Sequence, residues 1–92
     1  MQGEGSLHEL SLAMDVCRIT EDHVGRRSLG LVREVGVEVG DRSGVEFRTF
    51  EFCLESLLSA PPFVNARSRI ERTPGDELRV TYVEVDDGDS SD

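Results

Sequence analysis

The sequence predicts an α+β domain in which two helices pack on one face of a three-stranded, mostly antiparallel sheet, in the chain order α-β-α-β-β. Three observations predict this class. Two stretches carry apolar residues at helical spacing, three shorter stretches are typical of strands, and glycine or proline separates each stretch from the next. Because each element has one apolar face to bury, the five elements are expected to form two layers.

The first helix is expected from about His8 or Glu9 to Val24. Its apolar stripe recurs at three- and four-residue intervals and contains Leu10, Ala13, Met14, Cys17 and Val24, widened by Leu12, Val16 and Ile19. Gly25 follows at the position where glycine commonly ends a helix. The next segment, Leu31 to Val39, reads as a strand, with Leu31, Val35, Val37 and Val39 sharing one face.

Residues 40–44 (Gly-Asp-Arg-Ser-Gly) predict a turn before the second helix. Ser43 and Glu46 have the spacing of a capping box, in which each side chain accepts a hydrogen bond from an unpaired backbone amide of the helix start. This helix is expected to run to about Ser59. Its buried stripe is formed by Phe47, Phe50, Leu54, Leu57 and Leu58.

Pro61 and Pro62 exclude a longer helix. Asn65 to Thr73 then predicts a second strand, with its arginines on one face. Residues 73–76 (Thr-Pro-Gly-Asp) carry a strong turn signal, and Leu78 to Val85 predicts a third strand. The last two strands are expected to pair as a hairpin.

Composition and charge divide the chain into a Gly-rich flexible extension (1–6), one domain (7–85) and an acidic, disordered tail (86–92). The net charge of −9 disfavours nucleic acid and anionic membranes as partners, because both would repel the chain. No apolar run approaches the roughly 20 residues of a membrane span. The first residues also lack the pattern of a secretory signal, so we expect a cytoplasmic protein.

The sequence offers little for catalysis or for a zinc site. Cys17 and Cys53 are the only cysteines, and both lie among apolar residues, which favours inert, buried thiols. A disulfide between them requires the two helices to bring them together. Nucleophile elbows, phosphate-binding glycine loops and paired His/Cys arrangements are all missing, so we do not expect an enzyme.

Four segments of the chain are similar to a known family. They are His8-Glu9-Leu10-Ser11-Leu12-Ala13, the loop 40–45, Phe50 to Glu55, and Glu77 to Val80 with Val83 to Val85. Their order and spacing resemble the HypA family, the nickel-delivery proteins of hydrogenase and urease maturation. The resemblance covers Leu7 to about Val85. One departure is large: the family inserts a zinc module with two Cys-x-x-Cys pairs between its last two strands, and here a short turn stands in its place. We therefore expect no structural zinc.

The resemblance implies a Ni(II) site at the beginning of the first helix. Its ligands would be the His8 imidazole, the backbone nitrogens of His8 and Glu9, and the backbone nitrogen of Leu7 as the terminal amine. Square-planar nitrogen ligation suits Ni(II). The implied partners are a nickel-handling maturation GTPase similar to HypB and the large subunit of a hydrogenase, and a homodimer is a further expectation. His23, which follows two acidic residues at the helix end, is expected to be a favourable helix-terminal cation and not a ligand.

The six residues before Leu7 decide whether this site exists. With them attached, the Leu7 nitrogen is an amide, and the chelate loses the amine that would hold nickel against the neighbouring amides. Three origins of the extension stay open: translation starting at Leu7 through a leucine codon read as Met, residues added during cloning, or a genuine extension that weakens the site.

Two functions follow from the resemblance. The leading hypothesis is a nickel metallochaperone without its zinc module, which holds Ni(II) at His8 and hands it on. The alternative is an interaction module of hydrogenase maturation that has kept the fold and lost metal transfer. The sequence leaves open whether hydrogenase or urease is the client.

Overall fold

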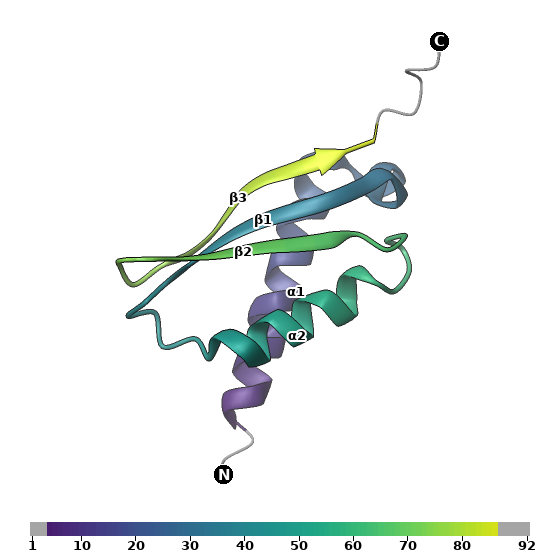
Figure 1. The fold of residues 1–92 in the computed structure, drawn as a ribbon. Coiled ribbons are helices and arrows are strands. Elements are labelled where there is room, and N and C mark those ends of the chain that lie inside the picture. The colour runs from purple at the N-terminus through teal and green to yellow at the C-terminus, as the bar shows by residue number, and fades with distance from the viewer. Residues whose placement is uncertain (1–3, 87–92) are drawn as a thin grey trace.

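A computed structural model describes residues 4–86, with side chains from His8 onward. The elements are α1 (Glu4–Val24), η1 (Arg26–Leu31), β1 (Val32–Gly40), α2 (Phe47–Leu58), β2 (Arg67–Thr73) and β3 (Leu78–Val85). Figure 1 shows two layers, with the three strands forming one and the crossed helices the other. The α+β class and the element order are confirmed; the short 3-10 helix η1, which joins α1 to β1, is an addition to the prediction.

Helix α1 begins at Glu4, ahead of the start predicted at His8 or Glu9. Residues 4–6 of the predicted extension therefore belong to the helix, and residues 1–3 lie outside the described part. The helix ends as expected: Gly25 adopts a φ of 90°, and its amide donates to the Glu21 carbonyl at 2.8 Å. Of the predicted acidic tail only Asp86 is described, and its amide donates to the Leu31 carbonyl at 2.8 Å.

The buried stripe of α1 is rotated from the prediction. Glu9, Ala13, Val16 and Thr20 are buried, whereas Leu10, Met14 and Ile19 are exposed. The two polar members of the stripe have hydrogen bonds: the Thr20 hydroxyl donates to the Val16 carbonyl at 2.8 Å, and Glu9 accepts from α2. The predicted stripe of α2 is confirmed, with Phe50, Leu54 and Leu58 in the core beside the β1 valines.

The strand order is β2-β1-β3, with β1 parallel to β2 and antiparallel to β3. The sheet is therefore mixed, and the predicted hairpin between the last two strands is wrong, because both pair with β1. Its buried valines make β1 the central strand, whereas β2 and β3 are half exposed and suit the edges. The link from Thr73 to Leu78 can span roughly 17 Å, more than the roughly 10 Å between strands two apart.

That link crosses the end of β1 and is fixed to it. The amides of Gly40, Asp41 and Arg42 donate to the carbonyls of Glu77, Thr73 and Gly75 at 2.8, 2.8 and 2.7 Å. A Cβ atom at Gly40 would lie 2.6 Å from the Gly75 oxygen, so only glycine fits at this crossing. The turn predicted at residues 73–76 is thus present, but it spans the central strand.

Candidate metal site at the beginning of helix α1

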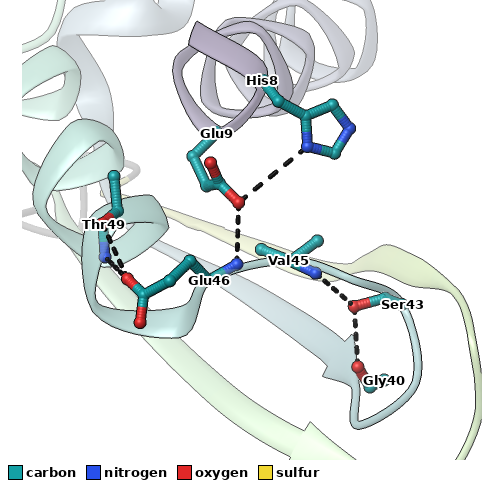
Figure 2. Close-up of polar contacts among 7 residues, drawn as sticks. All are labelled: His8, Glu9, Gly40, Ser43, Val45, Glu46 and Thr49. Carbon is teal, nitrogen blue, oxygen red and sulfur yellow. Dashed lines mark hydrogen bonds and ion pairs between the residues drawn. The ribbon is translucent and has the colours of Figure 1, made fainter. Parts of the chain in front are cut away.

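His8 presents its imidazole at the surface of α1. Its side chain is 56% exposed, and its Nδ1 atom lies 3.9 Å from Oε2 of Glu9. Figure 2 shows this nitrogen facing the carboxylate, with the other ring nitrogen directed away from it. The outward nitrogen is therefore open to an incoming ion. A carboxylate behind the inner nitrogen is an arrangement that orients metal-binding histidines in proteins.

Glu9 belongs to the interior of the domain. It is 2% exposed, and its Oε2 atom accepts a hydrogen bond from the Glu46 amide at 2.7 Å (Figure 2). Glu46 is the N-cap residue of α2, and amides at a helix start have no partner inside the helix. The carboxylate therefore joins the two helices and lies where the α2 dipole favours negative charge. Its Oε1 atom is buried and has no hydrogen-bond partner among the described residues.

The start of α2 differs from the predicted capping box. The Ser43 hydroxyl donates to the Gly40 carbonyl at 2.7 Å and accepts from the Val45 amide at 3.3 Å, so Ser43 stabilises the preceding turn (Figure 2). Glu46 itself is the N-cap residue. Its Oε1 atom accepts from the hydroxyl and the amide of Thr49 at 2.7 and 2.8 Å, and these bonds lower the pKa of the Glu46 carboxyl. The predicted spacing identified a cap three residues too early.

The backbone nitrogens of Leu7, His8 and Glu9 all lie within α1. In an α-helix each amide beyond the first turn donates to the carbonyl four residues earlier, so the His8 and Glu9 nitrogens are committed to Glu4 and Gly5. Among the described side chains, no three His, Cys, Asp or Glu residues are grouped so that they could hold a metal ion. The structure thus brings His8 and Glu9 together through their side chains, while the two amides belong to the helix.

A shallow hollow extends from His8 toward the turn between β2 and β3. Its lining includes Leu12 and Ile19 of α1, Val45 of the loop, and Asp76 with Leu78 after β2. On the far side of α1, Cys17 is half-buried and its thiol is free, and burial raises its pKa to about 11. Cys53 is also free and half-buried. His23 lies in the last turn of α1, as predicted.

The buried carboxylate is the feature that sequence reasoning missed. Glu9 was assigned a role through its backbone nitrogen alone. Its burial could have been read from spacing, because positions 9, 13, 16 and 20 repeat at helical intervals, with Ala13 and Val16 at the centre. A charged residue in such a stripe is expected to have a buried partner.

This fold and site define a small α+β domain with one exposed imidazole held by a buried carboxylate near the start of its first helix. Comparisons with known proteins identify the group. The family described as "Hydrogenase/urease nickel incorporation, metallochaperone, hypA" matches residues 7–85. The chain belongs to the HypA family, whose members handle nickel.

Individual relatives agree with this assignment. The chain is 36% identical over 61 residues to the hydrogenase maturation factor HypA of Parabacteroides distasonis, a match that covers 66% of this chain and 53% of the relative. It is 39% identical over 69 residues to the HypA of Geobacter metallireducens, covering 75% and 60%. The chain thus spans a little over half the length of these relatives.

The fold also matches a solved structure. The solution structure of the Ni metallochaperone HypA from Helicobacter pylori superposes with a TM-score of 0.69 at 16% identity, covering 85% of this chain and 97% of that one. This likeness confirms the α+β fold. In the part of the chain that the structure describes, neither helix has the length and apolar character required to cross a membrane.

Proposed function

We propose that this domain binds one Ni(II) ion at His8 and delivers it during the maturation of a [NiFe]-hydrogenase. Nickel is the cargo in this function, so the domain works by binding and release and needs no catalytic step. The observation that carries the proposal is the His8–Glu9 pair, in which a buried carboxylate fixed to α2 stands 3.9 Å behind an exposed imidazole.

The imidazole would supply the first ligand through its outward nitrogen. Glu9 would act as a positioning residue, because its carboxylate favours a proton on Nδ1 and leaves the other nitrogen as the donor atom. The carboxylate is held by the Glu46 amide, so the ring is oriented from the interior of the domain. This arrangement leaves one face of the imidazole open, which suits the transfer of an ion to a partner.

The backbone nitrogens of His8 and Glu9 would complete the site together with the nitrogen of Leu7. In the full chain the first two are helix donors, so nickel must displace two hydrogen bonds worth about 1 kcal/mol each. In a chain that starts at Leu7, the same nitrogens would fall among the unpaired amides of the first turn, and the Leu7 nitrogen would be an amine. Each coordinated amide must lose its proton, so nickel affinity rises with pH.

Calorimetric titration with NiCl₂ tests this proposal on chains that start at Met1 and at Leu7. The shorter chain should bind one ion, and the full chain should bind roughly 30-fold or more weakly, because of the two displaced hydrogen bonds and the missing amine. His8→Ala should abolish binding. His23→Ala is the matched control, since it removes the other exposed histidine of α1 and should leave the affinity unchanged. Equal loss in both variants, or no binding by the shorter chain, contradicts the proposal.

We further propose that the ion passes to a HypB-like maturation GTPase or to the hydrogenase large subunit, in the cytoplasm, without a structural zinc ion. The family and its curated relatives support this destination through their descriptions as hydrogenase maturation factors. The direct link from β2 to β3 through residues 74–77 supports the proposal that no structural zinc is bound between these strands.

A second function has an observation in its favour. The His8 and Glu9 amides belong to the hydrogen-bond ladder of α1, so in the full chain they are not free to bind nickel. This observation favours a module that binds partners without carrying nickel. Pull-down of a HypB-like GTPase by the wild-type chain and by His8→Ala separates the two. Equal capture with and without added nickel favours the interaction module, and nickel-dependent capture that His8→Ala removes favours metal delivery.

A further inference from the structure

The outer edge of β3 is the unprotected edge of the sheet. Edge strands that stay unpaired in proteins are commonly guarded by charged side chains. The other edge strand, β2, carries six charged or hydroxyl residues in the sequence Arg-Ser-Arg-Ile-Glu-Arg-Thr. Its Arg72 stacks over Phe47 with 4.6 Å between the guanidinium carbon and the ring centre. Strand β3 reads Leu-Arg-Val-Thr-Tyr-Val-Glu-Val, with only Arg79 and Glu84 charged, and it pairs with β1 alone.

A β-bulge gives β3 an unusual pattern of faces. Its pairing with β1 shifts between Val80 and Tyr82, so Thr81 is an extra residue. As a result, Leu78, Val80 and Val83 pack toward the helices, while Arg79, Thr81, Tyr82 and Glu84 are exposed. Inward and outward side chains therefore alternate regularly on each side of Thr81, but the alternation after Thr81 is shifted by one residue from that before it.

This displacement selects one way in which the strand can pair with itself. When a strand pairs antiparallel with a second copy of itself, residues that lie opposite each other must point to the same face of the sheet. In a regular strand, where the faces alternate with a period of two, the inward residues of both copies meet only when the two-fold axis passes through a residue. With one extra residue, the faces match across the whole strand only when the axis lies between Thr81 and Tyr82. The pairs, each made twice, are then Leu78 with Val85, Arg79 with Glu84, Val80 with Val83, and Thr81 with Tyr82.

The charges of β3 fit the same register. Glu84 faces Glu34 of β1 across the ladder, and among the described residues it makes no ion pair. Like charges directly opposite one another destabilise a sheet, so a cation opposite Glu84 on its outer side would stabilise this position. In the two-fold register, Arg79 of a second copy lies opposite Glu84. Arg79 already lies 3.3 Å from Glu38 of its own chain, which holds it on the open face of the sheet where the new partner would be.

The apolar side chains of β3 also find cover in this register. Val85 is 38% exposed although it pairs with the buried Val32, so its apolar surface is only partly covered. Its counterpart in the pair is Leu78, which borders the hollow that also contains Leu12 and the 45% exposed Ile19. Because this register keeps both helical layers on one side of the sheet, Val85 of the second copy would pack over this hollow.

We propose that two copies of this chain pair through the outer edges of their β3 strands, antiparallel and with the two-fold axis between Thr81 and Tyr82, so that one six-stranded sheet carries all four helices on one face. The net charge of −9 on each copy opposes this association. Its long-range part is screened at about 0.15 M salt, where the Debye length is about 8 Å.

Sedimentation equilibrium of the full chain over a range of concentrations tests the proposal through a charge swap. The wild-type chain should change from 10.2 kDa to twice that mass as concentration rises. Glu84→Arg should weaken the dimer roughly ten-fold or more, because two attractive pairs become repulsive. Arg79→Glu should do the same, and the double variant should restore the wild-type affinity.

Two features separate a weaker dimer from a weaker fold, which matters because Arg79→Glu also loses the pair with Glu38 of its own chain. Glu84→Arg gains an opposite charge across from Glu34, so it should unfold at the same or a higher temperature while its dimer weakens. Arg69→Glu is the matched control, since it makes the same charge reversal on the outer face of the opposite edge strand and should leave the dimer unchanged. A single 10.2 kDa species up to about 1 mM, or a dimer that Arg69→Glu weakens as much as Arg79→Glu does, overturns the proposal.

Discussion

Replacing Glu9 by alanine removes the carboxylate that joins α1 to the start of α2. The Glu46 amide has no acceptor within its own helix and donates to Oε2 of Glu9 at 2.7 Å, so the substitution would leave it without an acceptor in the protein. The Glu9 side chain is buried, so its removal also leaves an unfilled space between the two helices. The same change also removes the group that orients the His8 imidazole.

The size of the effect follows from these contacts. A hydrogen bond to a charged acceptor contributes about 1.5–3 kcal/mol, and the space left by the side chain adds to the loss. The unpaired Oε1 atom already carries a cost that alanine would relieve. The net loss should be roughly 2–3 kcal/mol, which lowers the melting temperature of a domain of this size by roughly 10–20 °C. Glu9→Gln keeps an acceptor oxygen and should lose only about 1 kcal/mol.

Thermal unfolding followed by circular dichroism measures this effect. Glu55→Ala is the matched control, because Glu55 is an exposed glutamate of α2 whose side chain makes no hydrogen bond or ion pair with the described residues. It should change stability by less than about 0.5 kcal/mol. In a chain that starts at Leu7, Glu9→Gln should also weaken nickel binding by roughly 10–100-fold. If Glu9→Ala and Glu55→Ala melt within about 2 °C of each other, Glu9 does not join the helices as described.

Three further predictions concern the sheet, the thiol and the α2 cap. Gly36→Ala should destabilise the domain by roughly 1–3 kcal/mol in urea unfolding, since its Cβ would lie 2.2 Å from the Tyr82 ring. Cys17, with a pKa of about 11, should react with iodoacetamide at pH 8 roughly 100-fold more slowly than a thiol with the ordinary pKa of 9.0. Thr49→Val should raise the pKa of Glu46 in a ¹³C NMR titration, because it removes the hydroxyl donor that most lowers that pKa.

Each of these predictions has its own control. Gly30→Ala meets no atom closer than 3.8 Å and should be nearly neutral, so equal losses at the two glycines would contradict the clash. Cys17 should react at an ordinary rate in denaturant, where its burial is lost. Because the folded-state pKa of Glu46 is lowered, the stability it contributes is present above its unfolded pKa and is lost as the pH falls through the folded value. Thr49→Val should shift that loss to higher pH.

The elements of the fold could be predicted because local spacing determines them. Three valines of β1 (Val35, Val37 and Val39), the stripe of α2 and the stop at Gly25 lie where periodicity and glycine placed them. The prediction was wrong at the start of β1, where Leu31 is exposed and Val32 is buried, because the strand has a register shift between Val32 and Glu34. Strand pairing could not be read in the same way. The turn signal at Pro74-Gly75 shows that the chain reverses there, but it does not show whether the two strands are neighbours or flank a third. That question is decided by β1, which pairs with a neighbouring strand along each of its two edges. This pairing is a property of the whole sheet.

The candidate site was predicted only in part. His8 was found from its position and from the resemblance, and the structure places it at the surface. The buried Glu9 was missed because apolar residues were used to define the stripe of α1, and a carboxylate in the core depends on an amide 37 residues away. The cap at Glu46 was misplaced for a similar reason, since Ser43 has two backbone partners of its own in the preceding turn.

Nickel coordination by the His8 and Glu9 amides is the claim on which the delivery function rests, and ¹⁵N-edited NMR observes those amides directly. A uniformly labelled chain that starts at Leu7 should lose the N–H signals of His8 and Glu9 on addition of one equivalent of Ni(II), because both nitrogens give up their protons. The remaining signals should stay sharp, as expected for a square-planar, diamagnetic ion. Persistence of both N–H signals at saturating nickel would contradict this account of the site.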